Sequence, residues 1–176
     1  MDMEKGFTLI ELLIVSAIIA LLSAGLVFYS RGGERQIILL KEQNKIISSV
    51  VKAKFLALAT FGDNSSPCGY GVHFETPNKI IIFKEIPAEV DDTGCFSIDG
   101  VYTAANPNEK QEEFLLDKTV KFGELQLGDI IFIPPDPLVV IDGNLLKTEA
   151  LIKIETVDGK SVKIIKITNS GQITTQ

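Results

Sequence analysis

The sequence predicts an α+β protein in which a long amino-terminal helix packs on a carboxy-terminal antiparallel β-sheet head. Three observations support this prediction. Residues 7–29 form an apolar run with a single charge, Glu11. Residues 34–60 then place apolar side chains at helical spacing. After Asn64 the pattern changes to the alternation of period two that is typical of strands. The 176 residues are enough for one ordinary domain and an appendage.

The apolar run, residues 7–29, is long enough to cross a bilayer. As a helix it would rise roughly 34 Å, which exceeds the thickness of the hydrocarbon core. A cleaved signal peptide fits less well. The apolar stretch of a signal peptide is shorter than residues 7–29, and the best candidate for its small-x-small cleavage site, Leu22-Ser23-Ala24, has a bulky leucine at the first position. A plain signal anchor stays open. Lys5 on one side and Arg31 on the other then leave its orientation undecided.

Glu11 is the residue of the apolar run that needs an explanation. Thr8 and Glu11 have the spacing of a capping box, in which the glutamate reaches back to the N-cap amide. A capping box accounts for a glutamate at a helix start. It does not account for a charge so close to hydrocarbon, where an unpaired carboxylate costs several kcal/mol.

The stretch GFTLIELL, residues 6–13, resembles the processing and methylation motif of type IV prepilins and of the pseudopilins of type II secretion. The resemblance implies a pilin-like fold and a leader of residues 1–6. A prepilin peptidase would cut between Gly6 and Phe7, and Phe7 would then be N-methylated. Glu11 takes the position of the glutamate that the family retains.

The resemblance also implies an assembly role for Phe7 and Glu11. The α-ammonium group of Phe7 and the carboxylate of Glu11 are opposite charges in a low dielectric, and pairing between neighbouring subunits would offset the cost of burying each. The implied partners are the prepilin peptidase and N-methyltransferase, other pilin or pseudopilin subunits, an inner-membrane assembly platform, and the lipid bilayer before assembly. The implied location is the cytoplasmic membrane, crossed once with the amino terminus inside, and then the fibre.

The helix divides into two halves after the leader. We expect a transmembrane half at residues 7–29, an amphipathic half at 30–61 and the β-rich extracytoplasmic head at 62–176. Gly25 and the pair Gly32-Gly33 are candidate points of kinking or melting. The apolar positions of the amphipathic half are Leu40, Ile47, Val51, Phe55 and Leu58, with Ile46, Val50 and Ala57 adjoining.

The head is predicted to consist of short antiparallel strands. Pro134, Pro135 and Pro137 imply a sheet edge or a crossover, and Asp158-Gly159 predicts a hairpin turn. The segment 87–110 is polar and rich in turn residues. The expected strands are Gly71–Thr76, Lys79–Ile86, Phe96–Thr103, Phe114–Phe122, Asp129–Ile133, Leu138–Ile141, Ala150–Val157, Ser161–Thr168 and Gln172–Thr174.

Two stretches of the head are similar to a particular group of minor subunits. The first is the strand that runs into Phe132-Ile133-Pro134-Pro135, and the second is the late hairpin followed by Asn169-Ser170-Gly171. Both are similar to the GspH/FimT type, which includes minor pseudopilins and minor type IV pilins. This likeness implies a minor structural subunit of a type IV pilus or of a secretion pseudopilus.

Charge is distributed unevenly along the chain. Residues 31–61 carry six basic and two acidic side chains, whereas residues 62–176 carry ten basic and eighteen acidic ones. An acidic head is poorly suited to phosphate backbones, so nucleic acid is not an expected partner. A cluster of lysines near the last hairpin keeps a tip-located module for DNA uptake or adhesion as an alternative. Its members are Lys153, Lys160, Lys163 and Lys166, diluted by Glu155 and Asp158.

The two cysteines, Cys68 and Cys95, allow one disulfide if the head lies outside the cytoplasm; the alternative is a pair of reduced thiols. His73 is the one histidine and is expected to be a surface or hydrogen-bonded residue. The acidic residues Glu89, Asp91 and Asp92 lack the regular spacing of a calcium loop, so no metal and no cofactor is expected.

The sequence shows no phosphate-binding glycine loop, nucleophile elbow or paired catalytic set. We therefore expect a protein that is a substrate of processing enzymes and not an enzyme itself. A membrane-anchored protein unrelated to pili is the remaining alternative.

Overall fold

The computed structural model describes residues 8–60, 67–86, 98–125, 127–135 and 138–176, with side chains omitted for 26–32. The chain forms two compact units, Met1–Ile37 and Ile38–Gln176. One helix, α1 (Leu9–Ala59), contributes to both units. Its helical assignment continues without a break through Gly32 and Gly33, the pair at which the sequence suggested a kink.

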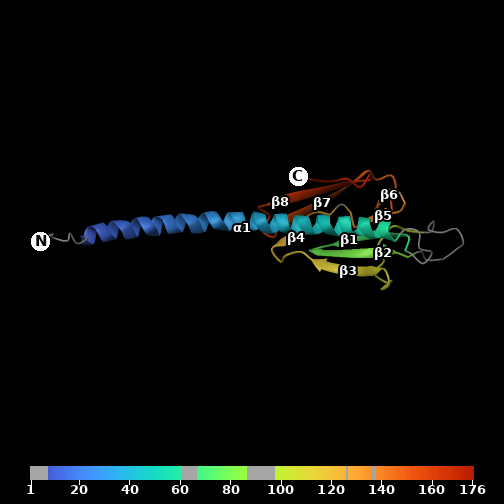
Figure 1. Ribbon diagram of the computed structural model, residues 1–176, viewed down its shortest axis with the longest axis horizontal. Coiled ribbons are helices and arrows are strands. Elements are labelled where there is room, and N and C mark those ends of the chain that lie inside the picture. The colour runs from blue at the N-terminus through green and yellow to red at the C-terminus, as the bar shows by residue number, and fades with distance from the viewer. Residues whose placement is uncertain (1–7, 61–66, 87–97, 126, 136–137) are drawn as a thin grey trace. The chain divides into compact units, whose positions relative to one another are not determined.

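The second unit contains two antiparallel sheets beside its part of α1 (Figure 1). Sheet A has the strand order β3-β2-β1-β5-β6, and sheet B has the order β4-β7-β8-β9. These strands confirm the predicted α+β, pilin-like class. Their bounds are β1 Gly69–Glu75, β2 Lys79–Glu85, β3 Lys110–Leu115, β4 Val120–Phe122, β5 Asp129–Ile133, β6 Leu138–Ile141, β7 Glu149–Thr156, β8 Val162–Thr168 and β9 Ile173–Thr175.

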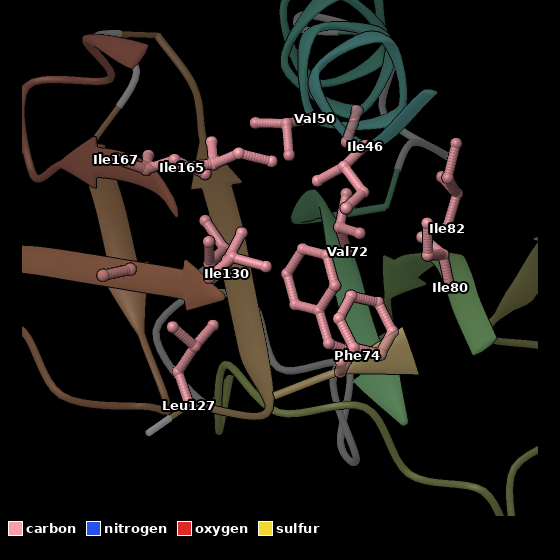
Figure 2. Packing of buried hydrophobic residues seen from close by; sticks show 14 of the residues in the cluster. Ile46, Val50, Val72, Phe74, Ile80, Ile82, Leu127, Ile130, Ile165 and Ile167 are labelled. Carbon is pink, nitrogen blue, oxygen red and sulfur yellow. The ribbon is translucent and has the colours of Figure 1, made fainter. Parts of the chain in front are cut away.

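The main core of this unit lies between α1 and both sheets. Figure 2 shows Ile46 and Val50 of α1 beside Val72 of β1, Ile130 of β5 and Ile165 of β8. All five side chains are fully buried. Because α1 also places small residues on this face, the helix can approach the strands closely; the buried residues of the face are Leu39, Ile46, Val50, Ala53 and Ala57.

The apolar positions at helical spacing in this part of α1 are divided between the core and the surface. Leu40, Val51, Phe55 and Leu58 are exposed, with Phe55 67% accessible, whereas the adjoining Ile46, Val50 and Ala57 are buried. The buried face lies about 130° around the helix from the exposed set, as follows from a rotation of roughly 100° per residue. A period of 3.6 residues fits both stripes equally well, so the sequence pattern could not tell which of them packs inward.

A smaller apolar cluster lies on the other face of sheet A. Phe83, Ile131 and Val140 are buried there, with Tyr102 packed against them. The ring of Phe83 crosses over β1 at Gly71, where a Cβ atom would lie 2.5 Å from Phe83 Cζ. A side chain at this glycine would therefore collide with the cluster.

Two expected strands were wrong in their bounds. Residues 98–103 of the expected strand Phe96–Thr103 are not in a strand, because their amides bond to carboxylates instead of to a neighbouring strand. The expected strand Phe114–Phe122 is two strands in different sheets. Asp117 separates them with a turn, in which it accepts hydrogen bonds from the Thr119 amide and from the Val120 amide.

The other strand predictions agree closely with the structure. β6 lies at an edge of sheet A and follows the Pro134-Pro135 turn, as expected from the prolines. Asp158 and Gly159 form the turn between β7 and β8. The division of the chain at residues 6, 29 and 61 stays a prediction.

Candidate assembly site at the amino-terminal helix

The amino-terminal end of α1 is closed by a capping box. Thr8 is the N-cap residue, and its hydroxyl oxygen accepts a hydrogen bond from the Glu11 amide at 3.3 Å. The Glu11 carboxylate in turn accepts from the Thr8 amide at 3.5 Å and from the Thr8 hydroxyl at 3.4 Å. These reciprocal bonds satisfy amides that a helix start leaves without partners. Glu11 therefore has a local role in addition to any assembly role.

The side chains of residues 9–25 present a largely apolar surface around the helix. All of residues 8–25 are exposed, and the large apolar side chains among them include Leu9, Leu13 and Ile18. Ser16 donates to the Leu13 carbonyl and Ser23 to the Ile19 carbonyl, so both hydroxyls are satisfied within the helix. A helix that is apolar all round is normally covered by lipid or by other helices.

Within the described part of the chain, no helical stretch meets the length and apolarity needed to cross a membrane.

The expected cleavage and methylation positions, Gly6 and Phe7, lie outside the described residues. The Phe7–Glu11 contact between subunits is therefore not tested by the structure, and it stays a prediction.

Comparison with known families assigns the amino-terminal segment to a class. Residues 1–27 match the family described as "Prokaryotic N-terminal methylation motif". The chain thus carries an amino-terminal methylation motif of the prepilin type. The match does not reach the head, and the GspH/FimT likeness stays a prediction. Comparison with curated proteins and with solved structures gave no match.

The lysine cluster of the last hairpin does not form one basic surface. Lys153 and Lys166 project from one face of sheet B, while Lys163, whose partner in the register is the buried Ile154, projects from the other. Lys153 also forms an ion pair of 3.2 Å with Glu155. Lys166 pairs with Glu149. This arrangement weakens the case for a nucleic-acid surface.

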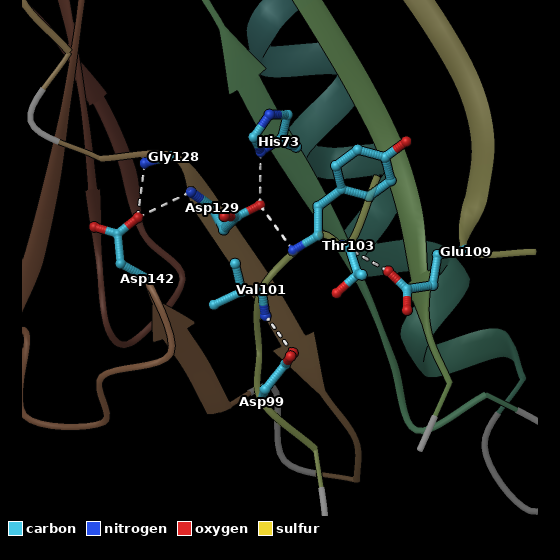
Figure 3. A network of polar contacts seen from close by, with 9 residues as sticks. His73, Asp99, Val101, Thr103, Glu109, Gly128, Asp129 and Asp142 are labelled. Carbon is cyan, nitrogen blue, oxygen red and sulfur yellow. Dashed lines mark hydrogen bonds and ion pairs between the residues drawn. The ribbon is translucent and has the colours of Figure 1, made fainter. Parts of the chain in front are cut away.

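The described acidic and histidine side chains of sheet A form a network that holds the 98–109 segment (Figure 3). Asp129 accepts hydrogen bonds from the Tyr102 amide at 3.2 Å and pairs with His73 Nδ1 at 2.9 Å. Glu109 accepts from the Thr103 amide at 2.8 Å. His73 is thus a hydrogen-bonded residue, as the sequence suggested, and the network fastens the segment beside sheet A.

Glu85 is the residue of this region that the sequence did not single out. It is 3% exposed, and its Oε2 atom has no hydrogen-bond partner among the residues that the structure describes. Burial, followed by the negative charges of Asp99, Glu109 and Asp129, raises the pKa of the Glu85 carboxyl to about 7, although the Asp99 amide opposes the shift. The signal available in the sequence was the position of Glu85 at the end of an apolar strand.

Asp142 shows the opposite effect at the end of β6. Its Oδ1 atom accepts from the Gly128 and Asp129 amides at 2.7 and 2.9 Å, and its Oδ2 atom pairs with Lys147 at 2.6 Å. Burial acts to raise the pKa of the Asp142 carboxyl, but the Lys147 contact and the two amides hold it below its ordinary value. This residue fixes the turn that follows β6.

The remaining candidate residues are placed only in part. Cys68 lies directly before β1, is buried and has no free thiol. Cys95 lies outside the described residues, so its pairing with Cys68 stays a prediction. Glu89, Asp91 and Asp92 lie outside as well. Among the residues that are described, no group of three or more histidine, cysteine or acidic side chains is placed to hold a metal ion.

Proposed function

We propose that this chain is a structural subunit of a type IV pilus or of a type II secretion pseudopilus, and not an enzyme. The observation that carries the proposal is the methylation motif at residues 1–27. In this proposal a prepilin peptidase removes residues 1–6 on the cytoplasmic side, and Phe7 becomes the methylated terminus. The subunit waits in the cytoplasmic membrane with its head outside until an assembly platform incorporates it.

The exposed apolar surface of residues 9–25 supports this proposal. Such a surface is stable in lipid, and it is equally stable when it is packed against the apolar helices of other subunits. Transfer from lipid to a helix bundle supplies no hydrophobic driving force, so packing and polar contacts must set the register. Glu11 is the one ionisable side chain in this stretch and is thus the natural register contact.

The capping box allows the two roles of Glu11 to be separated by a matched pair of variants. Glu11→Gln keeps an oxygen that can accept from the Thr8 amide but removes the charge. Thr8→Val removes the capping hydroxyl but keeps the charge. If Glu11 pairs with the Phe7 ammonium of a neighbour, Glu11→Gln lowers incorporation into the fibre and Thr8→Val does not.

The measurement is the amount of subunit in the sheared-fibre fraction relative to the membrane fraction. Cleavage after Gly6 is followed in both variants as a control for correct insertion. Loss of incorporation in Thr8→Val together with normal incorporation in Glu11→Gln would assign Glu11 to capping alone and overturn the pairing.

We further propose that the subunit is a minor one of the GspH/FimT type. The support is the strand β5, which runs into Pro134-Pro135, and the late β7–β8 hairpin followed by Asn169-Ser170-Gly171; these are the stretches that carry the likeness. Quantifying the subunit against the major subunit in purified fibres tests this assignment. A stoichiometry near one to one would contradict it.

A further inference from the structure

Residues 98–103, here called the strap, lie on the smaller apolar cluster of sheet A and are not part of a strand. The ring of Tyr102 packs on the ring of Phe83, with the two centroids 5.6 Å apart. A Cβ atom at Gly100 would lie 3.5 Å from Val140 Cγ1, so the main chain of the strap rests directly on the cluster. The strap therefore covers this cluster.

Hydrogen bonds to buried carboxylates fasten the strap, as Figure 3 shows. The Tyr102 amide donates to Asp129 Oδ1 at 3.2 Å. The Thr103 amide donates to Glu109 Oε2 at 2.8 Å. Asp129 is 4% exposed and Glu109 is 5% exposed. Charged acceptors make strong hydrogen bonds, but here they also place two negative charges beside the strap. The fastening is thus sensitive to any further charge that appears next to it.

Glu85 is a third buried carboxyl group on this side of sheet A. It lies two residues after Phe83 on β2, and residues two apart in a strand point to the same face. The Asp99 amide donates to its carboxyl group, which joins Glu85 to the strap. Its Oε2 atom, by contrast, has no hydrogen-bond partner within the residues that the structure describes. A negative charge on this carboxyl group would therefore be only partly compensated.

Acidic groups from three segments act on Glu85. They are Asp99 of the strap, Glu109 before β3 and Asp129 of β5. His73 of β1 contacts Asp129 at 2.9 Å. Lys84 precedes Glu85 on β2 and points to the opposite face of the sheet. Burial, followed by the three acids, raises the pKa of Glu85 to about 7. Glu85 thus changes its charge near neutral pH while the strap covers it.

We propose that the strap is a pH-controlled cover, which ionisation of Glu85 loosens so that the smaller apolar cluster is exposed. With Glu85 protonated, the carboxyl group adds no charge beside the other acids, and the strap stays closed. When the proton leaves to solvent, the carboxylate is repelled by Asp99, Glu109 and Asp129, and opening of the strap gives it access to water. The proposal concerns the head alone and does not depend on the fibre that the subunit joins.

Proton linkage gives the size of the effect. In the open form the carboxyl group of Glu85 is in water and has its ordinary pKa of 4.5, whereas in the closed form its pKa is about 7. The equilibrium between closed and open strap should therefore shift toward the open form by about 70-fold between pH 5 and pH 8. Glu85→Gln cannot ionise, so it should lack this shift.

Amide hydrogen exchange of Tyr102 and Thr103 tests the cover, because opening breaks the hydrogen bonds of both amides. The full chain is measured by NMR in detergent micelles, as wild type and as Glu85→Gln, at pH 5 and at pH 8. The ratio of the two exchange rates at one pH cancels the intrinsic rate, and any contribution of His73 is common to both proteins. This ratio should rise about 70-fold from pH 5 to pH 8. For the exposed control Glu124→Gln, the ratio should not change with pH.

Low concentrations of urea separate opening of the strap from unfolding of the whole head. The amides of Ile152 and Ile165, which face each other across β7 and β8, should exchange through global unfolding, which urea accelerates. Opening of the strap exposes little surface, so exchange of the strap amides should be faster and nearly independent of urea. A rate ratio for Glu85→Gln that does not change with pH, or the same urea dependence in strap and strands, would overturn the proposal.

Thiol labelling tests directly whether the cluster is uncovered. Val140 is 4% exposed under the strap, and Val140→Cys places a thiol there. At pH 8, labelling of this position by a maleimide, followed by peptide mapping, should be on the order of 100-fold faster with Glu85 present than in the chain that also carries Glu85→Gln. Equal labelling rates would mean that the strap stays closed over the cluster, and they would overturn the proposal.

Discussion

Neutralising Glu85 should stabilise the head at alkaline pH and remove part of its pH dependence. The side chain is 3% exposed, and no hydrogen-bond partner of its Oε2 atom lies within the described part of the chain. Burial and the surrounding acids raise the pKa of Glu85 from 4.5 to about 7. The folded protein therefore holds this proton over a pH range in which the unfolded chain releases it.

The sign and the size of the effect follow from proton linkage. Between pH 4.5 and pH 7 the folded state binds more protons at Glu85 than the unfolded state does, so the free energy of unfolding falls as pH rises. A difference of 2.5 pKa units corresponds to about 3 kcal/mol, lost in full above the folded pKa. The variant Glu85→Gln cannot ionise, and it should lack this loss.

The assay is urea unfolding of the full chain in detergent, followed by circular dichroism from pH 5 to pH 8.5. Glu85→Gln should resemble the wild type at pH 5 and exceed it by up to about 3 kcal/mol at pH 8. Glu124→Gln, at an exposed position, is the matched control and should follow the wild type. If Glu85→Gln keeps the wild-type slope between pH 5 and pH 7, the reasoning about the buried carboxylate is refuted.

Three further predictions concern the packing and the turn after β6. Gly71→Ala should destabilise the head by about 1–3 kcal/mol in the same assay, because its Cβ would collide with Phe83; an unchanged unfolding free energy would contradict this. Ile46→Ala should lower the free energy of unfolding by about 2–5 kcal/mol, because Ile46 is buried, whereas Phe55→Ala should change it by no more than about 0.5 kcal/mol, because Phe55 is exposed. Equal losses in the two variants would contradict this assignment of the buried and the exposed face of α1. Asp142→Asn should lower the free energy of unfolding at pH 7. The difference between the variant and the wild type should become smaller as the pH falls below about 4, because a carboxyl with a lowered pKa stabilises the folded state only while it is ionised. A difference in unfolding free energy that is constant from pH 7 to pH 3 would contradict this prediction for Asp142.

The strands that were predicted correctly are those that carry their own local signals. β7 and β8 alternate apolar and polar residues and are joined by Asp158-Gly159, so both the strands and their turn are encoded within about twenty residues. The same is true of the Thr8–Glu11 cap, whose two residues are three positions apart.

The features that were missed depend on contacts distant in sequence. The sequence of residues 98–103 is typical of a strand. In the structure, however, the Tyr102 amide donates to Asp129 and the Thr103 amide to Glu109, and the local sequence pattern does not predict these partners. Likewise, the exposure of Phe55 depends on which side of α1 the two sheets occupy. The site residues divide in the same way. Glu11 belongs to a contiguous motif, whereas the burial of Glu85 depends on how distant segments pack around it.

The most direct test of the central claim is the mass and the amino-terminal sequence of the chain expressed with and without a prepilin peptidase. The account predicts a product that begins with N-methylated Phe7 and appears only when the peptidase is present. A chain that stays uncut with an active peptidase, or one that is cut near Ala24, would contradict the assignment of residues 1–27 as a working prepilin motif.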